Sequence, residues 1–109
     1  MKDLTPFDFT PSYQPFDGEE VCFKLKPLDL QGMYEVQASM DDGVPGWGGI
    51  QSASKCIAGW SGPIGPFSRQ EVNRIVRGEA NFHWMVWLGH ITGELYRRAI
   101  LSEDDTKKS

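Results

Sequence analysis

The clearest alternation of hydrophobic and polar positions lies between residues 20 and 26. Val21, Phe23 and Leu25 recur there at every second position, which is the spacing of a strand with one buried face. A second, short strand is predicted over residues 55–60, and it can pair with the first. The pattern therefore predicts a two-stranded sheet.

The chain between these strands begins with a predicted helix and continues as a predicted loop. Asp29 is suited to cap a helix over residues 30–40. Residues 43–66 contain seven glycines and three prolines, which favour an irregular connection around the second strand. The residues that share one face of the helix at helical spacing are Leu30, Met33, Tyr34, Gln37 and Met40.

Two further helices are predicted in the C-terminal half. Ser68 and Glu71 form a capping box at the start of a helix over residues 69–77, and Gly78 ends that helix. A longer helix over residues 80–101 has an apolar stripe wider than one small partner helix requires, so it is either the centre of the core or an interface with another subunit. The stripe consists of Trp84, Leu88, Ile91, Leu95 and Ala99, widened by Met85, Val86 and Trp87.

Two glycines interrupt the long helix. Gly89 and Gly93 are four residues apart, and each glycine costs a helix up to about 1 kcal/mol relative to alanine. We therefore expect another element to approach the helix backbone closely at this position.

The N-terminal residues differ in character from the rest. Three prolines separate four aromatic residues within residues 1–19, which predicts an extended arm that is neither helix nor paired strand. The arm lies either across the protein's own core or on a neighbouring subunit. A single globular domain then covers residues 20–101, and residues 102–109 form a polar, flexible tail. The predicted fold class is α+β: a small, mostly helical domain with a two-stranded sheet, about three helices and the extended arm.

Composition narrows the class of protein. The 109 residues are 39% apolar and carry a formal net charge of −4, which fits one globular domain. An acidic chain has no surplus of Lys and Arg to neutralise phosphates, so nucleic-acid binding is not expected. No apolar run reaches the roughly 20 residues of a membrane helix, and the N-terminus has no apolar signal region. We therefore expect a cytoplasmic protein with no membrane partner.

The residues with catalytic or metal-binding chemistry are few and scattered. His83 and His90 are seven residues apart, roughly 10 Å along a helix, too far for one metal ion without further ligands. Cys22 and Cys56 lack CxxC spacing and are expected to be buried free thiols. No phosphate-binding loop or G-x-S-x-G motif occurs. The sequence predicts no enzyme, metal or cofactor; a weak enzyme or metal protein built on these four residues is the less favoured alternative.

The aromatic residues point instead to protein binding. They make up 12% of the chain, and aromatic side chains dominate binding hot spots. Trp47 stands alone in the glycine-rich loop, so we rank it first as a contact residue, and we rank Trp60 second. The alternative for both is an anchor within the protein's own core.

Short motifs occur in a fixed order along residues 20–109. A strand exits through Lys26-Pro27-Leu28, a turn reads Gly59-Trp60-Ser61-Gly62, a helix starts at Pro66-Phe67-Ser68, and the final helix leads into an acidic stretch that closes with Lys-Lys-Ser. In these motifs the chain resembles the small tail assembly chaperones of long-tailed bacteriophages and prophages.

The resemblance implies a non-enzymatic function in the host bacterial cytoplasm. Such chaperones bind the tape measure protein, keep its hydrophobic helices from aggregating, recruit tail tube proteins and are absent from the finished particle. The alternative is a phage-encoded inhibitor or adaptor that binds a host protein, such as a pilus, defence or secretion component. Self-association stays open in either case. The residues expected to bind protein are Trp47, Trp60, Trp84, Trp87, Leu88, Ile91 and Leu95.

Overall fold

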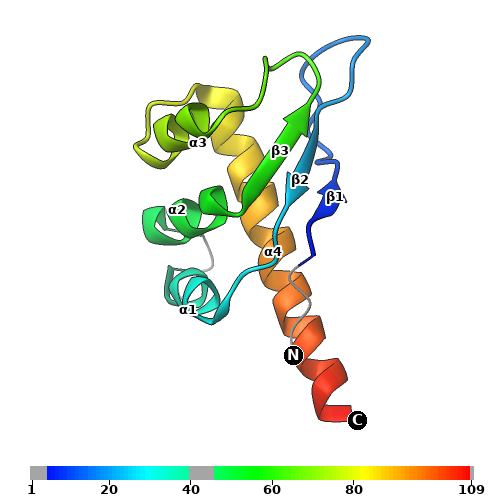
Figure 1. Cartoon of the computed structure of the whole chain (residues 1–109), viewed down its shortest axis with the longest axis vertical. Helices are drawn as coiled ribbons and strands as arrows, with labels where there is room; N and C mark the ends of the chain where they lie inside the picture. Colours follow the sequence, from blue (N-terminus) through cyan, green and yellow to red (C-terminus); the bar gives the residue numbers. More distant parts are fainter. Residues whose placement is uncertain (1–4, 40–45, 109) are drawn as a thin grey trace.

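The computed structural model describes residues 5–39 and 46–108. This part of the chain forms a three-stranded antiparallel sheet and four helices, which confirms the α+β class and adds one strand and one helix to the prediction. In Figure 1, α1, α2 and α3 lie on one side, the strands lie on the other, and α4 runs past both. In chain order the elements are β1 (Phe7–Phe9), β2 (Cys22–Leu25), α1 (Leu30–Ser39), α2 (Trp47–Lys55), β3 (Ile57–Ser61), α3 (Arg69–Val76) and α4 (Phe82–Lys108).

The middle strand of the sheet is β2, and its alternation is confirmed. Val21, Phe23 and Leu25 are fully buried, whereas Lys24 between them is exposed. Strand β3 pairs with β2 in antiparallel register, with Phe23 opposite Trp60.

The expectation that the N-terminal arm contains no paired strand is wrong. Residues 7–9 form the edge strand β1, in which Phe7 lies opposite Leu25 of β2. Pro6 and Pro11 lie just outside this strand, so they remove no hydrogen-bond donor from the ladder. An arm that is interrupted by prolines can therefore still supply a short strand between them.

The rest of the arm lies across the protein's own core, which is one of the two places expected for it. The Tyr13 hydroxyl is 2.9 Å from Nδ1 of His83, and the Trp87 indole N–H donates to the Tyr13 carbonyl oxygen at 3.0 Å. Phe16 packs edge-on against His83, with ring centroids 5.4 Å apart. These contacts fix the arm along the first turns of α4.

Helix α2 replaces residues 47–54 of the predicted loop and the start of the predicted second strand. The glycines were interpreted as loop formers, but Gly49 is buried where α2 crosses α1. A Cβ atom at Gly49 would lie only 3.3 Å from the Cα atom of Val36. Glycine is therefore present because two helices approach closely, and β3 begins only at Ile57, after the helix has ended.

Helix α1 forms as predicted but buries a different face. Gly32 and Val36 are buried, whereas Leu30 and Tyr34, from the face with apolar spacing, are each 66% exposed. Val36 lies at the close crossing with Gly49 of α2, whereas Gly32 is covered by Leu28 and Asp29, each 3.1 Å from where its Cβ atom would be. Met40 of the same face lies outside the described residues.

Helix α3 confirms the predicted Ser68 cap and Gly78 stop, whereas the Glu71 carboxylate, the other half of the predicted capping box, accepts a hydrogen bond from Arg74 at 3.0 Å. The Ser68 hydroxyl accepts from the Glu71 amide at 3.2 Å. At the other end, the amides of Gly78 and Glu79 donate to the carbonyl oxygens of Ile75 and Arg74, each at 2.9 Å, and Gly78 has a φ of +81°. This is the Schellman arrangement, which favours glycine.

Helix α4 continues to Lys108 and so includes most of the segment predicted as a tail. At 1.5 Å per residue its 27 residues span about 40 Å, close to the 43 Å long dimension of the molecule. Its C-terminal end extends beyond the other elements in Figure 1.

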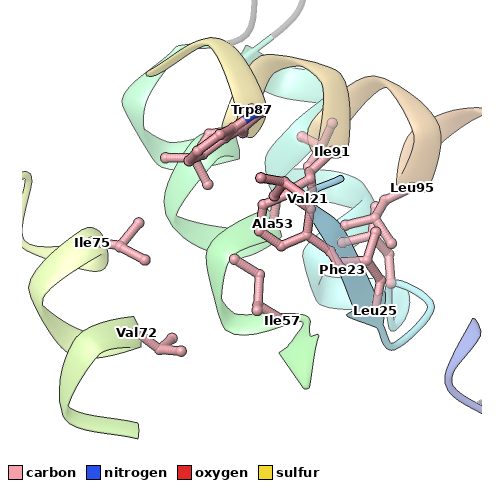
Figure 2. Packing of buried hydrophobic residues seen from close by; sticks show 13 residues of the cluster. Val21, Phe23, Leu25, Ala53, Ile57, Val72, Ile75, Trp87, Ile91 and Leu95 are labelled. Atoms are coloured by element: carbon pink, nitrogen blue, oxygen red, sulfur yellow. The ribbon is translucent and has the colours of Figure 1, made fainter. Parts of the chain in front are cut away.

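One hydrophobic core joins the sheet to the helices. In Figure 2 the side chains of β2 lie toward α4, where Ile91 and Leu95 meet them, while α3 adds Val72 and Ile75 from the other side. The largest buried side chain is Trp87, which lies 5.8 Å from the Phe23 ring between centroids.

Candidate functional site: an apolar groove between α2, α3 and α4

Four of the seven residues expected to bind protein belong to the core. Their exposed fractions are 4% or less, so they serve mainly the core, although Leu88 also lines the groove described below. The wide stripe of the long helix is thus the centre of the core at these positions, which was one of its two interpretations. The four residues are Trp87, Leu88, Ile91 and Leu95.

Trp60 and Trp84 are half-buried in a cluster of aromatic rings. Their centroids are 5.2 Å apart, and the Phe67 ring stands edge-on to Trp60 at 4.8 Å. The Trp60 indole N–H donates to the Gly65 carbonyl oxygen at 2.9 Å. Trp60 therefore anchors the turn after β3 to the core, which is the alternative that the sequence left open.

Trp47 is the predicted contact residue that remains most exposed. It is the first residue of α2, and 47% of it is accessible. A Cβ atom at Gly78 would lie 3.4 Å from Cζ2 of its ring. The indole therefore packs against the turn after α3 and forms one wall of the groove described next.

A groove with a volume of about 210 Å³ opens next to that wall. Ile75 of α3 and Leu88 of α4 line the groove, although both side chains are almost fully buried. Met85 also lines it, on the α4 side, and is 61% exposed. Phe82, 63% exposed, is three residues before Met85 and extends the apolar surface. Sequence reasoning missed Phe82, although a large apolar residue directly after the helix-capping Asn81 was a signal that could have been noted.

None of the described residues that line the groove is charged. Among these described lining residues Asn81 alone carries a side-chain amide, and its Oδ1 atom accepts from the Trp84 amide at 3.4 Å. Nearby charges neutralise each other, since Glu79 pairs with Arg77 at 3.0 Å on the exposed turn. The hydrogen bond from Arg77 lowers the pKa of Glu79 and keeps the carboxylate ionised. The groove is therefore apolar and electrically neutral.

A second, polar pocket of about 320 Å³ lies on the other side of α2. In it the Ser52 hydroxyl donates to the Glu35 carboxylate, while Lys26, Asp29 and Lys55 contribute charges. Cys56 also lines this pocket, and burial together with the charge of Asp29 raises the pKa of its thiol to about 11. The sequence did not indicate that these groups come together.

The candidate metal-binding residues do not converge. His83 lies among aromatic rings, including Tyr13 at a centroid distance of 5.9 Å, whereas His90 is exposed. Within residues 5–39 and 46–108, no group of three His, Cys, Asp or Glu side chains is placed to hold a metal ion. Cys22 and Cys56 are free and half-buried.

Among the described helices, none is both long and apolar enough to cross a membrane. In comparisons with known proteins, no family model, no curated protein and no solved structure matches this chain.

Proposed function

We propose that this chain is a non-enzymatic tail assembly chaperone that binds an apolar segment of a tape measure protein in the host bacterial cytoplasm. The observation that carries the proposal is the neutral groove beside Trp47, with Phe82 and Met85 exposed next to it. Exposed apolar surface of this kind is typical of binding sites for other proteins. The motifs along residues 20–109 supply the link to phage tails.

The chemistry of the polar pocket supports a binding function over a catalytic one. A thiol with a pKa of about 11 is almost entirely protonated at neutral pH, so Cys56 is a poor nucleophile. Ser52 is only 5% exposed, which leaves its hydroxyl little access to a substrate.

The proposal is tested by affinity capture of the tagged protein from cells with an induced prophage, followed by mass spectrometry. A tape measure or tail tube protein is the expected partner. Trp47→Ala should lower its recovery at least tenfold, because tryptophan hot spots typically contribute about 2 kcal/mol or more. Tyr34→Ala, which removes an exposed aromatic ring from α1, should leave recovery unchanged.

Circular dichroism of each variant checks that the fold is retained. Recovery of a bacterial protein alone would replace the chaperone proposal by the inhibitor alternative. Absence of any specific partner would overturn both.

A further inference from the structure

The shape of the groove restricts the conformation of what can occupy it. An extended peptide needs partners for its backbone N–H and C=O groups, which it normally finds at a sheet edge. This groove is bounded by α2, α4 and the turn after α3, and none of its described lining residues belongs to a strand, so they offer an extended peptide no sheet edge. A helix satisfies its own backbone groups and needs only apolar contacts from such walls.

The volume and charge of the groove restrict the side chain that enters it. A dry cavity of about 150 Å³ accommodates benzene, so a volume of about 210 Å³ is sufficient for one large side chain such as Leu, Met or Phe. A charged side chain would lose its hydration without gaining a counter-charge from the lining residues. The matching anchor is therefore uncharged and apolar.

The extent of the surface argues against a second folded copy as the occupant. A stable interface uses about 20–30 residues on each side and buries roughly 800 Å² per partner. Nine of the described residues line this groove, and Phe82 adds one more. A single helix can dock through a few anchors at helical spacing and needs no larger surface.

We infer that the groove between α2, α3 and α4 binds one helix from a different protein chain, anchored by a single uncharged apolar side chain beside Trp47. This inference rests on the proposed function, to which it adds the helical form of the bound segment and the character of its anchor.

Crosslinking in cells locates the bound segment. The photoreactive residue p-benzoylphenylalanine is placed at Phe82 of the full-length chain in cells with an induced prophage, and the crosslinked peptides are mapped. The matched control carries the same residue at Tyr34, an equally exposed aromatic position on α1. The expected adduct joins position 82 to an apolar segment of another protein, which position 34 does not reach. An adduct with a second copy of this chain, or none at position 82, would overturn the inference.

A charge placed in the groove then tests the anchor. A synthetic peptide of the mapped segment should become helical on binding and should bind Asn81→Asp at least tenfold more weakly than the wild type. Aspartate caps a helix as well as asparagine does, so this variant retains the fold. Asn73→Asp adds the same charge at an exposed position of α3 and should bind normally. Equal binding by both variants, or a bound peptide that stays extended, would contradict the inference.

The two proposals can fail separately. If the mapped helix belongs to a protein unrelated to phage tails, the groove assignment stands and the chaperone function fails. If a tail protein is captured but its adduct forms only at position 34, the chaperone function stands and the groove assignment fails.

Discussion

The two sides of α4 differ in how completely the rest of the chain covers them. On the inner side, Trp87, Ile91 and Leu95 meet the arm, the sheet and the neighbouring helices, and each is at most 1% exposed. On the outer side, Phe82 and Met85 remain more than 60% exposed. Both sides are apolar at the N-terminal end of the helix, so apolar content does not decide which residues form the core. The packing of other elements against α4 decides which residues form the core, and the apolar residues that stay exposed form the candidate binding surface.

The glycines of the covered and uncovered regions differ in how closely other elements approach their backbone. At Gly49, in the covered crossing of α1 and α2, a Cβ atom would lie 3.3 Å from the Cα atom of Val36. At Gly89 and Gly93, on the outer side of α4, a Cβ atom would meet no described atom within 4 Å other than its chain neighbours and the nearby backbone of its own helix. The close approach predicted for these two glycines is thus not made within the described part of the chain.

The largest effect is expected on the covered side. Trp87→Ala should lower the free energy of unfolding by about 3–5 kcal/mol, the usual range when a fully buried large aromatic residue is truncated. The substitution also removes the hydrogen bond to the Tyr13 carbonyl oxygen. Urea unfolding followed by circular dichroism measures the change. Trp87→Phe keeps much of the packing and should cost less. A loss below 1 kcal/mol for the alanine variant would show that the inner side does not hold the fold together.

The wall of the groove gives the next largest effect. Gly78→Ala places a side chain on a residue with a φ of +81° and should cost about 1–2 kcal/mol in the free energy of unfolding. The added Cβ atom itself fits, since its nearest contact with Trp47 is 3.4 Å. Gly78→Asn should cost less, because asparagine tolerates this conformation better. Equal urea midpoints for Gly78→Ala and the wild type would mean that the turn beside Trp47 is not held in its observed form.

The outer side of α4 should respond in the opposite direction. Gly89→Ala should raise the free energy of unfolding by about 0.5–1 kcal/mol, because alanine stabilises an exposed helix and the space for its methyl group is open. Gly49→Ala is the matched control at the covered crossing and should be destabilising. Urea unfolding at two protein concentrations is the measurement. A concentration-dependent loss for Gly89→Ala would indicate that a second copy covers this side.

The sequence predicted those parts of the fold whose cause is local. The Ser68 cap, the Gly78 stop and the alternation at Val21, Phe23 and Leu25 each depend on neighbours in the chain, and all are confirmed. Helix α2 was missed because the reason for Gly49 is a contact with another helix, which no local pattern shows. For the candidate site, the sequence ranked Trp47 first among the contact residues and left a core anchor open as the alternative; the structure leaves 47% of its surface exposed. The groove beside it joins residues from three helices and a turn, so it depends on tertiary packing.

The smallest effect concerns the boundary between the covered and uncovered sides, where Glu94 accepts hydrogen bonds from Arg97 and Arg98, each as short as 2.8 Å. The bond from Arg97 is the main cause that lowers the pKa of Glu94 in the folded protein. A lowered folded pKa stabilises the fold above the unfolded value, near 4.3, and that contribution is lost as the pH falls through the folded pKa. Both arginines are largely exposed, so the contribution is small. Arg98 also lies 3.7 Å from the centroid of the Phe7 ring, so the same cluster helps to hold β1 against α4. Urea midpoints measured from pH 7 to pH 3 should fall slightly less steeply for Glu94→Gln than for the wild type; identical slopes would mean that the ionised Glu94 carboxylate contributes nothing to the stability of the fold.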